Sequence, residues 1–291
     1  MGIELRTFAL MLCLTDQIGG KTVSKVLLRN SLLNRTPEEF LQISPEVMIE
    51  EYKIKPQSAQ KLTNDPSRSL EKARQAEAEF DRLGIQLVTA NDIHYPQRIE
   101  AMDPSPPTLL FLYGNKSLLQ SKTFSVLASR GASPAALNQI ESVTEAGTLN
   151  REKLVCGHDR IEYQRSAVVP LRWSAPRILC LDRGFFEVLG KNLKDEAFRA
   201  ARLWRYEFDP RTDLVISPFL PHAKFIGVNN QVRDRLIACL SDRLDFIHLN
   251  SNGNMEKLLK LALKAGRKVR VSDTILNYRQ YVDLGAEVIP T

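Results

Sequence analysis

Short apolar runs alternate with stretches of helical periodicity from Gly84 onward, and this pattern constrains the fold more than any other feature of the 291-residue chain. Brief apolar strands separated by helices are typical of a parallel sheet built from βαβ units. The pattern therefore predicts an α/β fold with a Rossmann-like, mainly parallel sheet flanked by helices, and ligands are expected at the C-terminal ends of the strands. The expected strands are 85–89, 124–128, 153–156, 177–181, 213–216, 245–249, 268–271 and 287–289.

The first 83 residues predict a different architecture, a small all-α domain. Apolar residues recur at helical spacing between Leu5 and Cys13, and Thr36-Pro37-Glu38-Glu39 and Ser44-Pro45-Glu46 both have the composition of a helix start. A charged amphipathic helix is expected over 71–83, ending at Gly84. We therefore expect a helical N-terminal domain over residues 1–83 and a Rossmann-like domain over residues 84–291.

The turn Ile18-Gly19-Gly20 lies between the first two expected helices. We expect its glycines to supply the positive φ that a tight helix–helix connection needs. The unit resembles a helix-hairpin-helix, or SAM-like, arrangement, in which backbone N–H groups of the turn hold a DNA phosphate. A plain connection inside a helical domain fits these residues at least as well.

Composition narrows the class of protein. The net charge of +6 favours an acidic partner such as nucleic acid, although charge alone is a weak indicator. No run approaches the ~20 apolar residues that span a bilayer, and the apolar stretch 8–14 lacks the flanks of a signal peptide. The four cysteines are scattered and form no metal-binding pattern. We expect a cytoplasmic protein with reduced thiols, no metal, no cofactor and no membrane association.

Several motifs of the second domain occur in the order of a known family. The lead-in consists of Asn91-Asp92-Ile93-His94-Tyr95-Pro96, Asp103-Pro104, Pro106-Pro107 and Leu112-Tyr113-Gly114-Asn115. The turn after the first core strand then matches at Ser129, Arg130 and Ser133, with Ala128 where a glycine is usual. On these residues the chain resembles a divergent member of the DprA/Smf family (DNA processing protein A).

A second close match to this family covers residues 232–241. It keeps Arg233 and Arg235 and has Asp234 in place of an asparagine. The turn 250–256 stands where the family has a phosphate-type turn before a helix. The chain departs from the family at Arg160-Ile161-Glu162, where the family has Gly-Ile-Asp, and the alanines and histidine that follow in the family are absent.

The resemblance implies a protein without catalytic activity that binds single-stranded DNA on its Rossmann-like domain. It further implies a role in DNA uptake and recombination, as in natural transformation (competence). A RecA-type recombinase is the expected partner, and a homodimer is a further assembly to test. The expected DNA-binding residues are Ser129, Arg130, Ser133, Arg233, Arg235, Ser251, Gly253 and Lys257.

Elementary chemistry agrees with these site residues. A polar turn before a helix presents free N–H groups, and Arg130 adds a cation that can fork onto phosphate. Arg233 and Arg235 open an apolar helix and can line a phosphate channel there, with structural ion pairs as the alternative. We expect Arg130 and Arg235 to be exposed, so that alanine at either position weakens DNA binding with little effect on stability.

Two other functions remain open. Gly253 and Glu256 faintly resemble the turn and glutamate of Rossmann-like nucleotide hydrolases, so a nucleotide sensor or hydrolase is one alternative. The second alternative is a paralogue that binds protein and has lost its DNA contacts, which the loss of several motif glycines would allow. Aromatic residues could stack on bases, although each is more commonly found in a core; the candidates are Tyr163, Trp173, Phe185 and Phe186.

Overall fold

The computed structural model describes residues 2–90 and 92–290, so Asn91 of the lead-in motif lies outside the described residues. Contacts divide the chain into two compact units. The first comprises the residues up to Tyr95 together with Ser105–Phe111, and the second comprises Pro96–Pro104 and the residues from Leu112 onward. Within the described residues, no helix is both long and apolar enough to cross a membrane.

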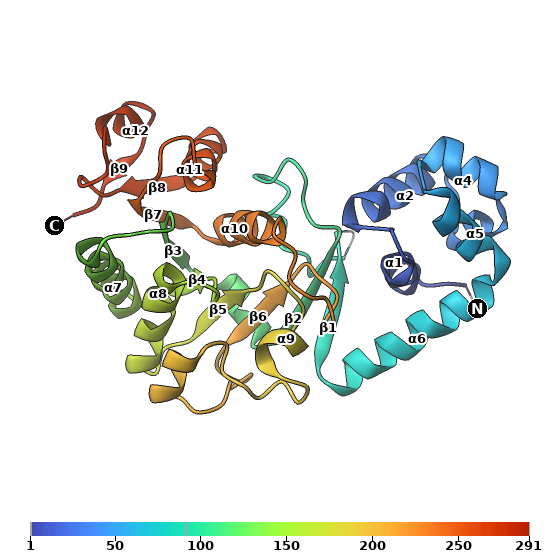
Figure 1. Ribbon diagram of the computed structural model, residues 1–291, viewed down its shortest axis with the longest axis horizontal. Coiled ribbons are helices and arrows are strands. Elements are labelled where there is room, and N and C mark those ends of the chain that lie inside the picture. Colours follow the sequence, from blue (N-terminus) through green and yellow to red (C-terminus); the bar gives the residue numbers. More distant parts are fainter. Residues whose placement is uncertain (1, 91, 291) are drawn as a thin grey trace. The chain divides into compact units, whose positions relative to one another are not determined.

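The first unit consists mainly of helices (Figure 1). They end at Arg82, next to the boundary expected at residue 83, but the unit continues through strand β1 (Ile85–Thr89). The helices are α1 (Leu5–Leu14), α2 (Gly20–Leu32), α3 (Pro37–Gln42), α4 (Pro45–Tyr52), α5 (Pro56–Asn64) and α6 (Pro66–Arg82).

Local sequence explains how these helices begin. Thr36 caps α3 in a capping box with Glu39, and Ser44 caps α4, both as expected. The glycine turn differs from the expectation, because Gly19 has φ −94° and Gln17 is the residue with positive φ, at 64°. The glycines are therefore not required for the bend, which weakens the helix-hairpin-helix interpretation of this turn.

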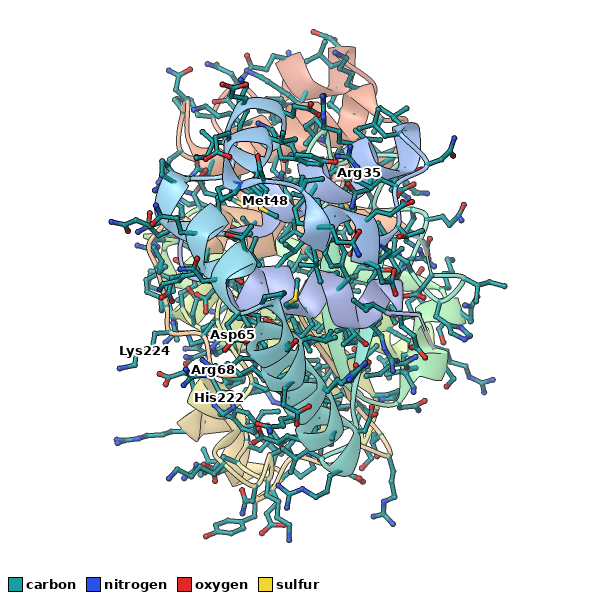
Figure 2. The ribbon with its side chains drawn as sticks, turned by 90° about the vertical axis from the view of Figure 1, so that its right-hand side faces the viewer. Arg35, Met48, Asp65, Arg68, His222 and Lys224 are labelled. Carbon is teal, nitrogen blue, oxygen red and sulfur yellow. The ribbon has the colours of Figure 1, made fainter. Side chains whose placement is uncertain are left out.

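Aromatic packing forms the core of the first unit. The Phe40 ring lies edge-on to the rings of Phe8 and Tyr52, at centroid distances of 5.3 and 5.0 Å. Met48 is fully buried with them. Figure 2 shows Met48 among these helices and Asp65 and Arg68 at the start of α6, where the Asp65 carboxylate accepts a hydrogen bond from the Arg68 backbone N–H at 2.9 Å.

The second unit alternates strands and helices. Strand β2 (Leu109–Gly114), which the sequence pattern did not predict, lies across the boundary of the two units. It is followed by η1 (Lys116–Gln120), β3 (Thr123–Ala128), α7 (Pro134–Leu149), β4 (Lys153–Cys156), α8 (Ile161–Arg172), β5 (Arg177–Cys180), α9 (Phe186–Leu189), η2 (Arg199–Leu203), β6 (Leu214–Ser217), α10 (Asn229–Leu240), β7 (Arg243–His248), α11 (Asn254–Lys264), β8 (Lys268–Val271), α12 (Arg279–Asp283) and β9 (Glu287–Val288).

The strands of this unit form a parallel sheet in the order β6-β5-β4-β3-β7-β8-β9. The chain runs outward from β3 to β6 in one direction and then returns to β7 and continues to β9 in the other. The strand order therefore reverses between β3 and β7, and such a reversal opens a crevice at the carboxyl ends of the two strands. The predicted Rossmann-like, mainly parallel fold is confirmed.

Helices cover the sheet on both faces. Helices α7 and α8 pack on β3 and β4, while α10 contacts β3, β4 and β5 and also packs against α11. Right-handed crossovers place α7 and α8 on one face and α10 and α11 on the other, as Figure 1 shows. The N-termini of α7 and α11 both lie at the carboxyl edge where the crevice forms.

Candidate nucleic-acid interface

The ends of β3 and β7 are joined by hydrogen bonds at the point where the strand order reverses. The Ser129 backbone N–H donates to the His248 carbonyl at 2.8 Å, and the Ser129 hydroxyl accepts from the Asn250 N–H at 2.9 Å. Ser129 is 5% exposed. The Ser129 hydroxyl therefore links the loop after β3 to the loop after β7.

Two pockets open at this edge. The first, of about 230 Å³, includes Ser129, Arg130 and Gly253 from the expected site. The second, of about 180 Å³, lies between α10 and α11 and includes Arg235 and Lys257. Asp234 and Asn254 line both, so the two pockets adjoin at a shared wall, and together they are called the crevice below. Five of the eight expected residues thus line one site, although they are spread over more than 120 positions of the sequence.

Arg130 and Lys257 are the exposed cations of this crevice. The Arg130 carbonyl accepts from the Asn250 amide at 3.2 Å, which fixes the backbone of the turn. Among the residues that the structure describes, no carboxylate is within ion-pairing distance of the Arg130 guanidinium. Its side chain is therefore available to an anionic ligand.

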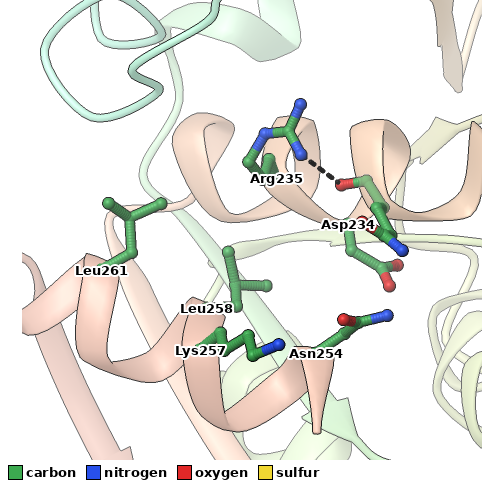
Figure 3. A pocket seen from close by; sticks show the side chains of 7 residues that line it. Asp234, Arg235, Asn254, Lys257, Leu258 and Leu261 are labelled. Atoms are coloured by element: carbon green, nitrogen blue, oxygen red, sulfur yellow. Dashed lines mark hydrogen bonds between the residues drawn. The ribbon is translucent and has the colours of Figure 1, made fainter. Parts of the chain in front are cut away.

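Arg235 is only partly available. Its Nε donates to both carboxylate oxygens of Asp103, at 3.0 and 3.1 Å, and its side chain is 27% exposed. Figure 3 shows it on α10 at the rim of the second pocket, with a hydrogen bond to the backbone. The expectation that Arg235 is exposed is corrected, because its side chain is partly buried and pairs with the buried Asp103 carboxylate as well as facing the pocket.

Arg233 is buried, with 1% of its surface exposed. Its guanidinium lies 2.5 Å from the Asp159 carboxylate, 2.8 Å from that of Asp234 and 3.8 Å from that of Asp182. Burial lowers the pKa of Arg233, but the neighbouring Asp234, Tyr163 and Asp159 outweigh it and raise the pKa overall. Arg233 is therefore a positioning residue, which holds the loops after β4 and β5 against α10, and a direct phosphate contact would require it to leave these partners.

In each of the two expected phosphate turns, a backbone N–H is already engaged by a glutamate. The Glu162 carboxylate accepts from Gly131 N–H at 2.9 Å, and the Glu256 carboxylate accepts from Asn252 N–H at 2.5 Å. Ser133 caps α7 by accepting from the Ala136 N–H at 3.2 Å, and Ser251 is exposed in the turn before α11. The expectation of free N–H groups at Gly131 is wrong, because a glutamate distant in sequence fills that turn.

Gly253 has a steric reason to be glycine. A Cβ at this position would lie 2.8 Å from the Asn250 carbonyl oxygen, closer than van der Waals contact allows. The backbone of the turn closes tightly here, with Gly253 N–H donating to the same carbonyl at 3.0 Å. The close approach shapes the wall of the first pocket.

The titratable groups in and near this crevice are poorly suited to acid–base or nucleophilic catalysis. Hydrogen bonding to the Lys260 ammonium, 2.6 Å away, lowers the pKa of Glu256, which keeps it ionised and engaged. Burial raises the pKa of the Cys156 thiol to about 12, so it is a poor nucleophile. No cluster of three or more histidine, cysteine or acidic residues within 2–90 and 92–290 could hold a metal ion.

Sequence reasoning missed three polar side chains of the site. Asn254 lines both pockets, and Asn230 and Arg160 line the first. The Nε and Nη2 of Arg160 and the Oδ1 of Asn230 are buried without a hydrogen-bond partner among the described residues. The departure at 160–162 was a signal for Arg160, whereas nothing in the local sequence marks either asparagine. Of the aromatic candidates, Tyr163 and Phe185 are buried, Phe186 is half-buried and Trp173 is exposed.

Comparison with known proteins agrees with this fold. Residues 86–158 match the family described as DNA recombination-mediator protein A. Among curated proteins, none matches the chain. The structure is similar to that of DNA processing protein A (DprA) from Streptococcus pneumoniae, with a TM-score of 0.69 and 18% identity over 99% of this chain and 95% of that one.

A second similar structure concerns the single-stranded DNA binding mode of DNA processing protein A from Helicobacter pylori. Its TM-score is 0.56, with 17% identity over 71% of this chain and 92% of that one. These matches agree with the resemblance found in the sequence: residues 86–158 match the model of the DNA recombination-mediator protein A family, and the chain has the fold of DprA.

Proposed function

We propose that this protein binds single-stranded DNA in the crevice between the ends of β3 and β7. The observation that carries the proposal is the position of Arg130, Arg235 and Lys257 around two adjoining pockets at the point where the strand order reverses. Cations along a groove attract the phosphates of a strand and release its counterions. The net charge of +6 adds to this attraction at long range.

The shape of the crevice favours a single strand over a duplex. The second pocket lies between α10 and α11, and the two pockets have polar amide groups in their walls, from Gln231, Asn230 and Asn254. An unpaired base can enter such a recess, whereas the bases of a duplex are paired with one another and stacked inside it. The related Helicobacter pylori protein, studied for its single-stranded DNA binding mode, supports the same choice.

The same proposal includes a role in recombination. A protein that holds a single strand by its phosphates can pass it to a RecA-type recombinase, and DNA uptake in natural transformation supplies such strands. The family matched by residues 86–158 is named for mediating recombination, which supports this part of the proposal. A homodimer is a further proposed assembly.

We propose binding without turnover. The carboxylate of Glu256 is engaged by the Asn252 N–H and by Lys260, so it is poorly placed to act as a general acid or base. The purified protein should release neither base nor phosphate from nucleoside monophosphates, NAD or ATP. Release that disappears in Glu256→Ala would move the protein into the nucleotide hydrolase class.

Fluorescence anisotropy with a labelled oligo-dT and with a duplex of equal length tests the binding. The single strand should bind more tightly, and Arg130→Ala should weaken binding about tenfold, because it removes one charge-assisted contact. Arg211→Ala is the matched control, since its side chain is 91% exposed and lines neither pocket. An oligo-dT that does not bind at low salt would refute the proposed function.

A further inference from the structure

The carboxylate of Asp234 stands at the seam between the two pockets, and its two oxygens have different surroundings. Oδ1 accepts from the Tyr163 hydroxyl at 2.6 Å and from the Arg233 Nε at 2.8 Å. Oδ2 has no hydrogen bond to any described residue, and the Arg160 Nη2 lies 4.0 Å from it. Figure 3 shows the carboxylate pointing from α10 toward Asn254 of α11. One strong acceptor is thus presented to whatever occupies the crevice.

The second pocket has the character of a site for a flat ring with polar edges. Leu258 and Leu261 give it apolar walls (Figure 3), and Gln231 and Asn254 add amide groups to its lining. A small number of polar groups in an otherwise apolar recess is the usual arrangement for an organic ligand. Its volume of about 180 Å³ lies below the ~300 Å³ at which sites for drug-sized ligands begin, so it suits a single ring system.

The charges around the two pockets indicate which part of a nucleotide enters the second pocket. A phosphate at the seam would meet the Asp234 Oδ2, which accepts hydrogen bonds and donates none, while the guanidinium groups of Arg160 and Arg233 beside it are balanced by the carboxylates of Asp234 and Asp159. The cations Arg130 and Lys257 lie at the exposed rim, where phosphates can meet them while staying in water. The base is therefore the part that enters the recess, and the backbone of the strand follows the rim.

We propose that the pocket between α10 and α11 holds one nucleobase and that the free Oδ2 of Asp234 selects a base with an exocyclic amine. This inference rests on the proposed binding of single-stranded DNA. A carboxylate accepts hydrogen bonds and donates none, so it pairs with the amine of cytosine or adenine and repels the carbonyl oxygen at the same position of uracil or thymine. The crevice therefore prefers cytosine over uracil. An interface that contacted only phosphates would bind all sequences alike.

Oligo-dC and oligo-dU of equal length give the sharpest test, because the two bases differ only in the amine or carbonyl at one ring position and its effect on the neighbouring nitrogen. Anisotropy at slightly alkaline pH, where oligo-dC stays single-stranded, should show oligo-dC binding about fivefold more tightly or better. Asp234→Asn should bring the ratio of the two affinities close to one. The asparagine Oδ1 can still accept from Tyr163 and Arg233, so the fold is expected to persist.

Asp283→Asn is the matched control, because it removes the same charge at an exposed position that lines neither pocket, and it should leave the ratio unchanged. If the unsubstituted protein binds both oligomers equally, the inference is wrong and the proposed function stands. If it binds neither at low salt, the proposed function itself fails. A preference that survives in a folded Asp234→Asn would show that another group reads the amine, and would overturn the role of Asp234.

Discussion

The Glu162 carboxylate accepts a hydrogen bond from the Gly131 backbone N–H at 2.9 Å, although 31 residues separate the two in the chain. Glu162 is 4% exposed while Gly131 is exposed, so this is a partly buried, charge-assisted contact. It occupies the turn where a Rossmann-like fold commonly receives a phosphate. The anion-binding capacity of this crevice therefore depends on side chains such as Arg130 and Lys257.

Replacement of Glu162 by alanine should destabilise the protein by about 1–3 kcal/mol, because the Gly131 N–H loses its partner in a partly buried turn. Glu162→Gln should cost less, since the amide oxygen can still accept. Urea denaturation measures both. The exposed Glu187→Ala serves as the control and should stay within about 0.5 kcal/mol of the unsubstituted protein. Equal stability of Glu162→Ala and the control would contradict this role for the contact.

Arg130→Ala and Arg235→Ala should differ in stability although both residues line the crevice. Arg235→Ala removes the guanidinium that pairs with Asp103, which is 3% exposed, and should cost about 1–2 kcal/mol after allowance for the partial exposure of Arg235. Arg130→Ala should leave the melting temperature nearly unchanged. Thermal unfolding of the two variants side by side checks this, and an equal loss in both would mean that Arg130 is structural as well.

Arg233→Ala should be the most damaging of the arginine substitutions. It leaves the carboxylates of Asp159, Asp182 and Asp234 close together without their shared cation, and loss of one partner from a buried ion pair typically costs about 3–5 kcal/mol. Denaturant unfolding with Arg211→Ala as the exposed control measures the difference. A variant as stable as that control would show that Arg233 is not needed to hold the loops.

His158 should make stability depend on pH. Burial lowers its pKa from 6.5 to about 4, so the folded state binds fewer protons than the unfolded state between these values. The contribution of His158 is present above pH 6.5 and is lost as the pH falls toward 4, by about 1.4 kcal/mol per pH unit and about 3 kcal/mol in total. Unfolding free energies measured across this range should fall less steeply in His158→Gln. Parallel curves for the two proteins would contradict the shift.

Much of the fold follows from local patterns in the sequence. All eight expected strands occur, several with the predicted bounds, because short apolar runs between helices have few other structures available. Strand β2 was missed since its residues were interpreted as a family motif and not as an apolar run. The helix expected from residue 71 begins at Pro66, where Asp65 provides the cap.

The site was harder to predict, because its decisive contacts are made between distant segments. The Glu162 carboxylate accepts from the Gly131 N–H, and Asp103 pairs with Arg235. No local sequence pattern predicts either contact. Arg233 looks like a surface cation in sequence, yet the loops after β4 and β5 bring two carboxylates to it. The residues that face the crevice were found through their match to the motifs of the DprA/Smf family, whereas burial of their charges depends on tertiary packing.

The salt dependence of oligo-dT binding tests the central claim most directly. With Arg130, Arg235 and Lys257 at the crevice, the logarithm of the affinity should fall with the logarithm of salt concentration with a slope of about −2, at ~0.7 per neutralised phosphate of a single strand. Arg130→Ala should reduce the slope by ~0.7, and Arg211→Ala should leave it unchanged. An affinity that does not vary with salt, or a slope that Arg130→Ala leaves intact, would contradict a phosphate-binding crevice at this edge of the sheet.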